Sequence, residues 1–162
     1  MSSTIKNILV ALDHSESSNL VFEEALNLAK ALNAQMILIH VVSAEESISP
    51  RMMPTGSIMG GYSEISSVSF EQFREDWQAY IDRGNEMLQT RVQQAAESGV
   101  EAKCQQLSGG TGLQICESAK TWDADLIAIG RRGYSGLKEF LIGSISNYVL
   151  HHAPCSVMII HK

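Results

Sequence analysis

One stretch of the chain gathers residue types that can bind an anion. Residues 130–150, GRRGYSGLKEFLIGSISNYVL, hold four glycines, three cationic side chains and three serines between two apolar runs. Glycine lets a backbone N–H approach a ligand without a Cβ in the way, and a helix N-terminus offers unpaired N–H groups with a partial positive charge. The stretch therefore predicts either a cradle for a phosphate group or a simple turn followed by a capped helix, and spacing alone leaves both open.

In the cradle interpretation, Gly130 and Gly133 form the turn after a strand, and Gly143 opens the next helix. Ser144 and Ser146 then add hydroxyl donors. In the structural interpretation the glycines form only the turn, and Ser144 only caps the helix. The chain has no GxxxxGK[ST] P-loop and no GxGxxG after its first strand, so two common nucleotide-binding motifs are excluded.

Short apolar, β-branched runs alternate with amphipathic runs along the chain. We expect strands at 5–12, 35–42, 100–107, 124–130 and 155–161. We expect helices at 16–32, 70–98, within 108–122 and at 143–152, the first of them capped by Ser15 or Ser17. Residues 43–69, rich in Ser, Met and Gly, show neither period and are expected to form an irregular insertion.

Alternation of strands and helices predicts an α/β fold. We expect one doubly wound domain over residues 1–162, with a five-stranded parallel sheet of order 3-2-1-4-5 and helices on both faces. Such sheets bind ligands beyond the carboxyl ends of their strands, where the strand order reverses. Asp13, after the first strand, and Gly130, at the end of the fourth, should then face each other across a crevice.

Composition excludes several classes of function. The formal net charge of −6 argues against general binding to nucleic acid or to an anionic membrane surface. No apolar run approaches the roughly 18 residues of a membrane-spanning helix, so we expect no membrane insertion. Cys104, Cys116 and Cys155 form no CxxC pair and indicate reduced thiols, which favours a cytoplasmic protein.

Other groups of chemically capable residues favour structural roles. The sequence DHS at 13–15 lies on one turn, whereas a catalytic triad assembles from distant segments. GSISN at 143–147 lacks the second glycine of a nucleophile elbow. The two histidines at 151–152 end a helix, where imidazolium interacts favourably with the negative end of the helix dipole. This role is favoured over metal binding. Trp77 and Tyr80 lie on the apolar stripe of the second helix and are expected in the core.

The spacing Gly130-x2-Gly133-x9-Gly143-Ser144 resembles the G-x2-G-x9-G-[S/T] signature of nucleotide-binding universal stress proteins. ALDHSESS resembles the first strand of that family with its aspartate, ILIHVV resembles the second strand, and residues 124–160 resemble the C-terminal block. The resemblance covers the chain apart from the insertion at 43–69. It implies the ATP-binding branch of the family and favours the cradle interpretation.

The resemblance also implies a role for each matching position. Asp13 and the backbone of Ala11 and Leu12 would contact the ribose or adenine side, and the Val41 backbone would face adenine. The ribose and α-phosphate would lie against Gly130, Arg132 and Gly133. The phosphates would be held by Gly143, Ser144, Ile145 and Ser146. His14 is bulkier than the family's usual residue and is expected to crowd the site or to contact phosphate.

The function implied by the resemblance is that of an ATP-binding stress-response regulatory protein, acting through nucleotide-dependent conformation or through an unidentified protein partner. The expected ligands are ATP, ADP or AMP with Mg²⁺. Because family members pair through the last strand, a homodimer through residues 155–161 is expected. Two alternatives stay open. One is a slow Mg²⁺-dependent ATPase that uses Asp13 and Arg132, and the other is a nucleotide-free interaction module of the same fold.

Overall fold

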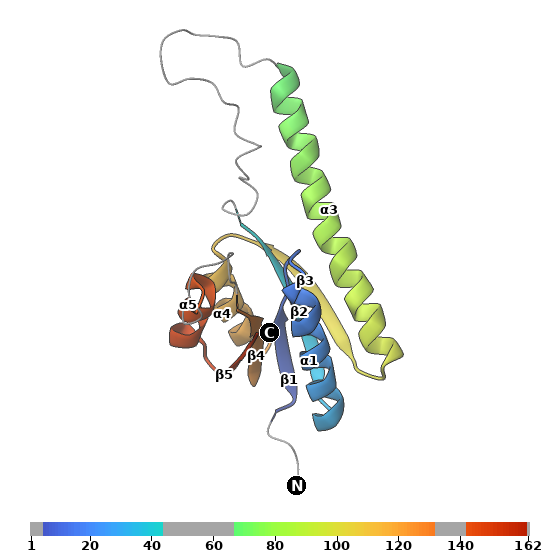
Figure 1. Cartoon of the computed structure of the whole chain (residues 1–162), viewed down its shortest axis with the longest axis vertical. Helices are drawn as coiled ribbons and strands as arrows, with labels where there is room; N and C mark the ends of the chain where they lie inside the picture. The colour runs from blue at the N-terminus through green and yellow to red at the C-terminus, as the bar shows by residue number, and fades with distance from the viewer. Residues whose placement is uncertain (1–4, 44–66, 132–141, 162) are drawn as a thin grey trace.

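The computed structural model describes residues 5–43, 67–131 and 142–161. The described strands are β1 (Asn7–Ala11), β2 (Gln35–Val42), β3 (Ala102–Ser108), β4 (Leu126–Gly130) and β5 (Ser156–Ile160). The described helices are α1 (Ser17–Leu32), α3 (Ser67–Glu97), α4 (Thr111–Thr121) and α5 (Ser144–His152). Figure 1 shows how they are arranged.

The five strands form one parallel sheet of order β3-β2-β1-β4-β5, which confirms the predicted fold class and strand order. The central strand β1 pairs with β2 on one edge and with β4 on the other, so that Ala11 lies between Ile39 and Ile129. The strand order reverses between β1 and β4. A ligand crevice is therefore expected beyond Ala11.

Two apolar layers cover the sheet. On one face, side chains of α1 and α3, among them Phe22 and Leu88, pack against Val10 and Leu38. On the other face, side chains of α4 and α5 pack against the neighbouring strand residues of opposite orientation, such as Ile39. Burial on both faces explains why the strands are almost continuous apolar runs.

Observed element ends differ from the predicted ones by three residues or fewer. The largest difference is at α3, which begins at residue 67 and not at 70, so the predicted irregular insertion of 43–69 is three residues too long at this end. Residues 44–66 of that insertion lie outside the described part of the chain. Helix ends make the fewest intrahelical hydrogen bonds, so sequence pattern fixes them least well.

The long helix α3 extends well past the sheet (Figure 1). A helix of 31 residues spans about 46 Å, whereas an eight-residue strand such as β2 spans about 26 Å. Phe70 and Phe73 are consequently 62% and 42% exposed. The prediction that Trp77 and Tyr80 belong to the core is wrong, because both lie near the sheet edge and are only half-buried. Within the described ranges, no helix combines the length and the apolar character that crossing a membrane requires.

Candidate functional site

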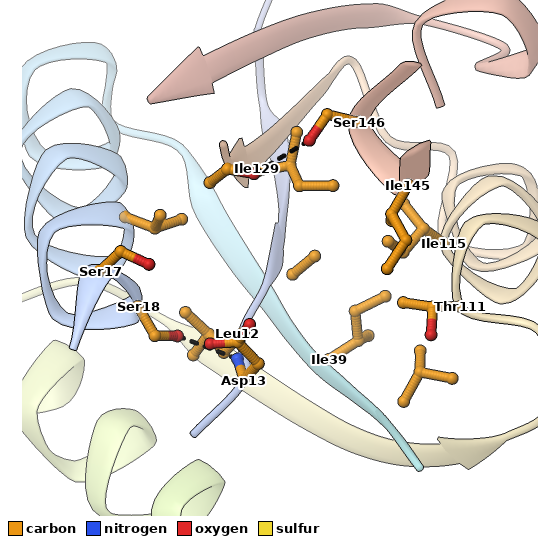
Figure 2. Close-up of a pocket in the computed structure, with 14 residues that line it drawn as sticks. Leu12, Asp13, Ser17, Ser18, Ile39, Thr111, Ile115, Ile129, Ile145 and Ser146 are labelled. Atoms are coloured by element: carbon orange, nitrogen blue, oxygen red, sulfur yellow. Dashed lines mark hydrogen bonds between the residues drawn. The ribbon is translucent and has the colours of Figure 1, made fainter. Parts of the chain in front are cut away.

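A pocket opens at the carboxyl ends of β1, β2 and β4 (Figure 2). One wall comes from the end of β1 and the start of α1, and it consists of Ala11, Leu12, Asp13, Ser17, Ser18 and Val21. The remaining lining comes from β2, α4, β4 and α5, and it consists of Ile39, Val41, Thr111, Ile115, Ile129, Gly130, Ile145 and Ser146. The pocket therefore lies at the switch point of the strand order, where Asp13 and Gly130 were expected to meet.

Seven of the predicted site residues line this pocket: Ala11, Leu12, Asp13, Val41, Gly130, Ile145 and Ser146. Gly143 and Ser144 begin α5 directly before two of these residues but are not part of the lining. Arg132 and Gly133 lie outside the described residues. The structure thus brings together most of the predicted positions, while their contacts with a ligand remain a prediction.

The chain leaves β1 through a turn that fixes Asp13. The backbone N–H of Asp13 donates to Ser18 Oγ at 2.9 Å, and the backbone N–H of Ser15 donates to Asp13 Oδ1 at 2.9 Å. The Ser15 hydroxyl also donates to Asp13 Oδ1. The predicted helix cap is wrong, since Glu16 occupies the N-cap position of α1 and no side chain makes the capping bond. The serines are used instead to hold the turn and its carboxylate.

Val41 presents its backbone to the crevice. Within β2, the N–H groups of Gln35 and Met36 bond Lys6 and Glu101, so odd-numbered residues face β1 and even-numbered residues face β3. The bonds from Leu12 N–H to Ile39 O and from Gly109 N–H to Val42 O follow the same alternation. β1 ends at Ala11, opposite Ile39.

The N–H and C=O of Val41 therefore point past the end of β1, and the described residues provide no partner for them there. Val41 as a whole is only 5% exposed. Buried backbone groups in proteins are almost always hydrogen-bonded. Val41 thus offers a donor and an acceptor side by side at the pocket.

The N-terminus of α5 is tied to the end of β4. The Ser146 hydroxyl donates to the Gly130 carbonyl oxygen at 3.0 Å, and Ser146 is 1% exposed. Its hydroxyl proton is therefore committed within the protein, which departs from the expected role as a donor to phosphate. Gly143 occupies the N-cap position without a side-chain cap, and the Ser144 hydroxyl has no hydrogen-bond partner in the described ranges.

Three helices begin at this pocket: α1, α4 and α5 each contribute lining residues from their first or second turn. None of the three has a side-chain hydrogen bond at its N-cap. The first N–H groups of a helix have no intrahelical partner and carry a partial positive charge. At the starts of α4 and α5 these backbone groups contribute positive charge to the pocket, in a chain whose formal net charge is −6.

His14 is not among the residues that line the pocket, although the preceding Asp13 is. Its ring packs edge-on against His40 at 4.8 Å and against Tyr80 at 5.1 Å between ring centroids, on the α3 side of β1. Burial lowers the pKa of His14, and the nearby Arg83 lowers it further, while Asp13 raises it. Burial raises the pKa of Tyr80.

Other candidate residues have structural contacts. His152 Nδ1 lies 2.8 Å from the Tyr148 carbonyl oxygen and its ring stacks on Tyr148, as expected for a histidine that ends a helix. Cys104, Cys116 and Cys155 are free thiols whose pKa is raised by burial. Over the residues that the structure describes, no group of three His, Cys, Asp or Glu side chains is placed to hold a metal.

Sequence reasoning did not name seven of the lining residues as part of the site: Ser17, Ser18, Val21, Ile39, Thr111, Ile115 and Ile129. Ser18 and Thr111 carry the available signal, since each is a hydroxyl residue in the first turn of a helix that follows a strand. Ile115 gave no signal beyond the apolar stripe of α4.

Comparison with known proteins places this architecture in a family. The model of the universal stress protein family matches residues 4–161. The chain is 37% identical over 156 residues to universal stress protein Sll1388 of Synechocystis sp., covering 94% of this chain and 96% of that protein. It is 31% identical over 153 residues to universal stress protein YxiE of Bacillus subtilis, covering 94% and 97%.

Solved structures share the fold. The universal stress protein UspA from Lactobacillus plantarum superposes with a TM-score of 0.73 at 25% identity, covering 98% of this chain and 99% of that one. A family member from Arabidopsis thaliana with AMP bound has a TM-score of 0.61 at 22% identity, covering 96% and 90%. Another universal stress protein, in complex with cAMP, has a TM-score of 0.61 at 19% identity, covering 98% of both chains.

A universal stress protein from Archaeoglobus fulgidus in complex with dAMP has a TM-score of 0.58 at 20% identity, covering 99% of this chain and all of that one. These three likenesses establish the shared architecture. Together with the family model, which spans nearly the whole sequence, and the two relatives of similar length, they lead to one conclusion. The chain belongs to the universal stress protein family.

Proposed function

We propose that this protein binds an adenine nucleotide, ATP with Mg²⁺, in the pocket at the carboxyl ends of β1, β2 and β4. It acts in the stress response as a regulatory protein, and the bound nucleotide changes its conformation or its affinity for a protein partner. The observation that carries the proposal is the backbone N–H and C=O of Val41, which face the crevice and have no partner among the described residues.

Adenine has the complementary groups for Val41. Its N1 accepts a hydrogen bond and its 6-amino group donates one, side by side on the same edge of the ring. The surrounding side chains of Ile39, Ile115 and Ile145 are apolar and suit the faces of a purine. Guanine carries an N–H at position 1 and a carbonyl at position 6, so it would oppose donor to donor and acceptor to acceptor.

The phosphates would lie at the N-terminus of α5. The N–H groups of Gly143, Ser144 and Ile145 have no partner one turn earlier in the helix, and the Ser144 hydroxyl has no partner among the described residues. Asp13 and the backbone of Ala11 and Leu12 would hold the ribose side, with Gly130 closing the opposite side. Arg132 and Gly133, outside the described residues, complete the proposed set. Mg²⁺ would be held mainly by phosphate oxygens.

The bound ligands of the structural relatives support an adenine nucleotide, since AMP, dAMP and cAMP each occur with this fold. We further propose that two chains pair through β5. In the described residues β5 pairs only with β4, and its outer edge is open. An open strand edge presents a row of unpaired backbone groups, which a second copy covers.

Equilibrium dialysis against labelled ATP, with and without Mg²⁺, tests the nucleotide proposal on protein freed of carried-over nucleotide. Saturable binding near one ATP per chain is expected. Gly143→Val is expected to abolish it, because the side chain would occupy the space of the phosphates, while φ of −57° and ψ of 155° suit valine and preserve the fold. Absence of ATP binding by folded wild-type protein would leave the nucleotide-free interaction module as the better account.

A further inference from the structure

Thr111 is a polar side chain at the base end of the pocket, and sequence reasoning did not single it out. The inference drawn from it rests on the proposed function, because it concerns how the same site recognises its base. It begins with the turn between β3 and α4.

This turn brings the first residue of α4 beside Val41. Gly109 has a φ of +129°, which L side chains rarely adopt, and its N–H donates to the Val42 carbonyl oxygen at 3.1 Å. Gly110 is the N-cap of α4, and Thr111 follows as its first residue. The start of α4 is therefore held against the end of β2, and Thr111 and Val41 both line the pocket.

Thr111 is also the polar exception in this part of the lining. The other side chains contributed there by β2 and α4 are Ile39, Val41 and Ile115, all apolar. From the start of α5 come Ile145 and Ser146, and the Ser146 hydroxyl is bonded to the Gly130 carbonyl oxygen. Figure 2 shows Thr111 on the same side of the pocket as Ile115 and Ile145, across from Asp13 and Ser18. A hydroxyl in apolar surroundings gains most from a partner supplied by a ligand.

The hydroxyl of Thr111 is not used by the protein. Thr90 and Thr121 donate their hydroxyls to the carbonyl oxygens of Glu86 and Glu117, one turn earlier in their helices. Thr111 is the first residue of its helix, so no helical carbonyl precedes it by one turn. No hydrogen bond joins its hydroxyl to any part of the chain that the structure describes, and α4 has no side-chain cap.

We propose that Thr111 is a specificity-determining residue that hydrogen-bonds the edge of adenine adjacent to the one bound by Val41, with the 6-amino group shared between the two edges. On that edge the second proton of the 6-amino group is a donor and N7 is an acceptor. A hydroxyl both accepts and donates, so one threonine satisfies both groups. The Val41 carbonyl oxygen and the Thr111 hydroxyl oxygen then each accept one proton of the 6-amino group, so the pocket recognises the base on two edges.

The test compares ATP with 7-deaza-ATP, in which a C–H group replaces N7. Wild-type protein is expected to bind 7-deaza-ATP about 5- to 10-fold more weakly than ATP, the loss typical of one neutral hydrogen bond. Thr111→Val, which keeps the shape and removes the hydroxyl, is expected to bind ATP about 5- to 10-fold more weakly and to bind the two nucleotides equally. Thr111→Ser is expected to retain the preference.

Equal binding of the two nucleotides by wild-type protein overturns the proposal, and this measurement does not depend on whether Thr111→Val folds. An undiminished preference for ATP in folded Thr111→Val also overturns it. If wild-type protein binds neither nucleotide, the proposed function itself fails and this inference falls with it. Binding of both nucleotides with equal affinity refutes only the role of Thr111.

Discussion

The Ser146 hydroxyl donates a hydrogen bond to the Gly130 carbonyl oxygen at 3.0 Å, across sixteen residues of sequence. This bond joins the first turn of α5 to the last residue of β4. It sets the position of the helix N-terminus that the proposed phosphate site requires. Ser146 therefore holds the helix in position, while the Ser144 hydroxyl has no partner in the part of the chain that the structure describes.

Replacement of these two serines should separate support from ligand contact. Ser146→Ala is expected to lower the free energy of unfolding by about 1–3 kcal/mol, because it leaves the half-buried Gly130 carbonyl without its donor. Ser144→Ala is expected to change it by less than about 0.5 kcal/mol and to weaken ATP binding. Urea denaturation and dialysis measure the two effects. If Ser146→Ala instead weakened ATP binding and left stability unchanged, the Ser146 hydroxyl would contact the phosphate.

Gly84 permits α3 to approach the sheet over His40. A Cβ at Gly84 would lie 2.6 Å from His40 Nδ1 and 2.1 Å from Gln106 Nε2, two atoms that are themselves 2.9 Å apart. Gln106 can move its amide, but the His40 ring is 1% exposed. Gly84→Ala is therefore expected to destabilise the protein by about 1–3 kcal/mol in spite of the better helix propensity of alanine.

The control for this change is Asn85→Ala, on the exposed side of the same helix turn. It gains helix propensity without a clash and is expected to leave stability unchanged or slightly raised. Denaturant unfolding monitored by circular dichroism measures both variants. Equal stability of Gly84→Ala and wild type would show that α3 has room to move away from β2.

His14 should make stability depend on pH on the acid side. Its pKa is lowered in the folded state, first by burial and then by Arg83, against the opposing effect of Asp13; His40 and Tyr80 are the other titratable groups that face it. The unfolded state, with a histidine pKa of about 6.5, then binds the proton more readily. Above that pH His14 does not lower the free energy of unfolding. As the pH falls below it, the unfolded state takes up the proton first, and the free energy of unfolding decreases.

Denaturation midpoints measured between pH 7.5 and pH 5 test this dependence. His14→Gln is expected to lose less stability over that range than wild type. His151→Gln, on the exposed end of α5, serves as the control and should follow the wild-type curve. Parallel curves for all three proteins would contradict a role for His14.

Val157→Pro should test pairing through β5. The bond from Arg131 N–H to Ile160 O shows that even-numbered residues of β5 face β4, so the N–H of Val157 faces the open edge. Proline removes that N–H without breaking the ladder to β4. The variant is expected to stay folded and to sediment as a monomer, whereas Met158→Pro should destabilise the sheet itself. A dimeric Val157→Pro would exclude edge pairing at this position.

The alternation of apolar runs predicted a parallel α/β sheet, whereas the order 3-2-1-4-5 and its switch point were assumed as a doubly wound topology that fits five strands, and the structure confirms them. Asp13 follows β1 and Gly130 ends β4 on either side of the reversal, so their common pocket followed from that topology. The extent of α3 beyond the sheet was not predictable in the same way. An amphipathic stripe shows which face of a helix is apolar, but it does not show where the sheet beneath Phe70 or Trp77 ends.

The hydroxyl partners within the site were also beyond sequence reasoning. Ser18 reaches back to Asp13, and Ser146 reaches Gly130, and both bonds depend on how a helix is seated on the sheet. Serine at a helix start predicts a cap equally well. The position of Thr111 in the pocket depends on the turn at Gly109, and the sequence did not predict the positive φ of that residue.

β2 continues to Val42, while its neighbour β1 stops opposite Ile39. The end of the pocket proposed to hold the base is thus a gap left by one short strand, and apart from the Thr111 hydroxyl its hydrogen-bonding groups belong to the main chain of Val41. An alanine scan of the lining would pass over Val41, since alanine has the same N–H and C=O. Lengthening β1 by two residues would place main chain opposite Val41 and pair its N–H and C=O within the protein.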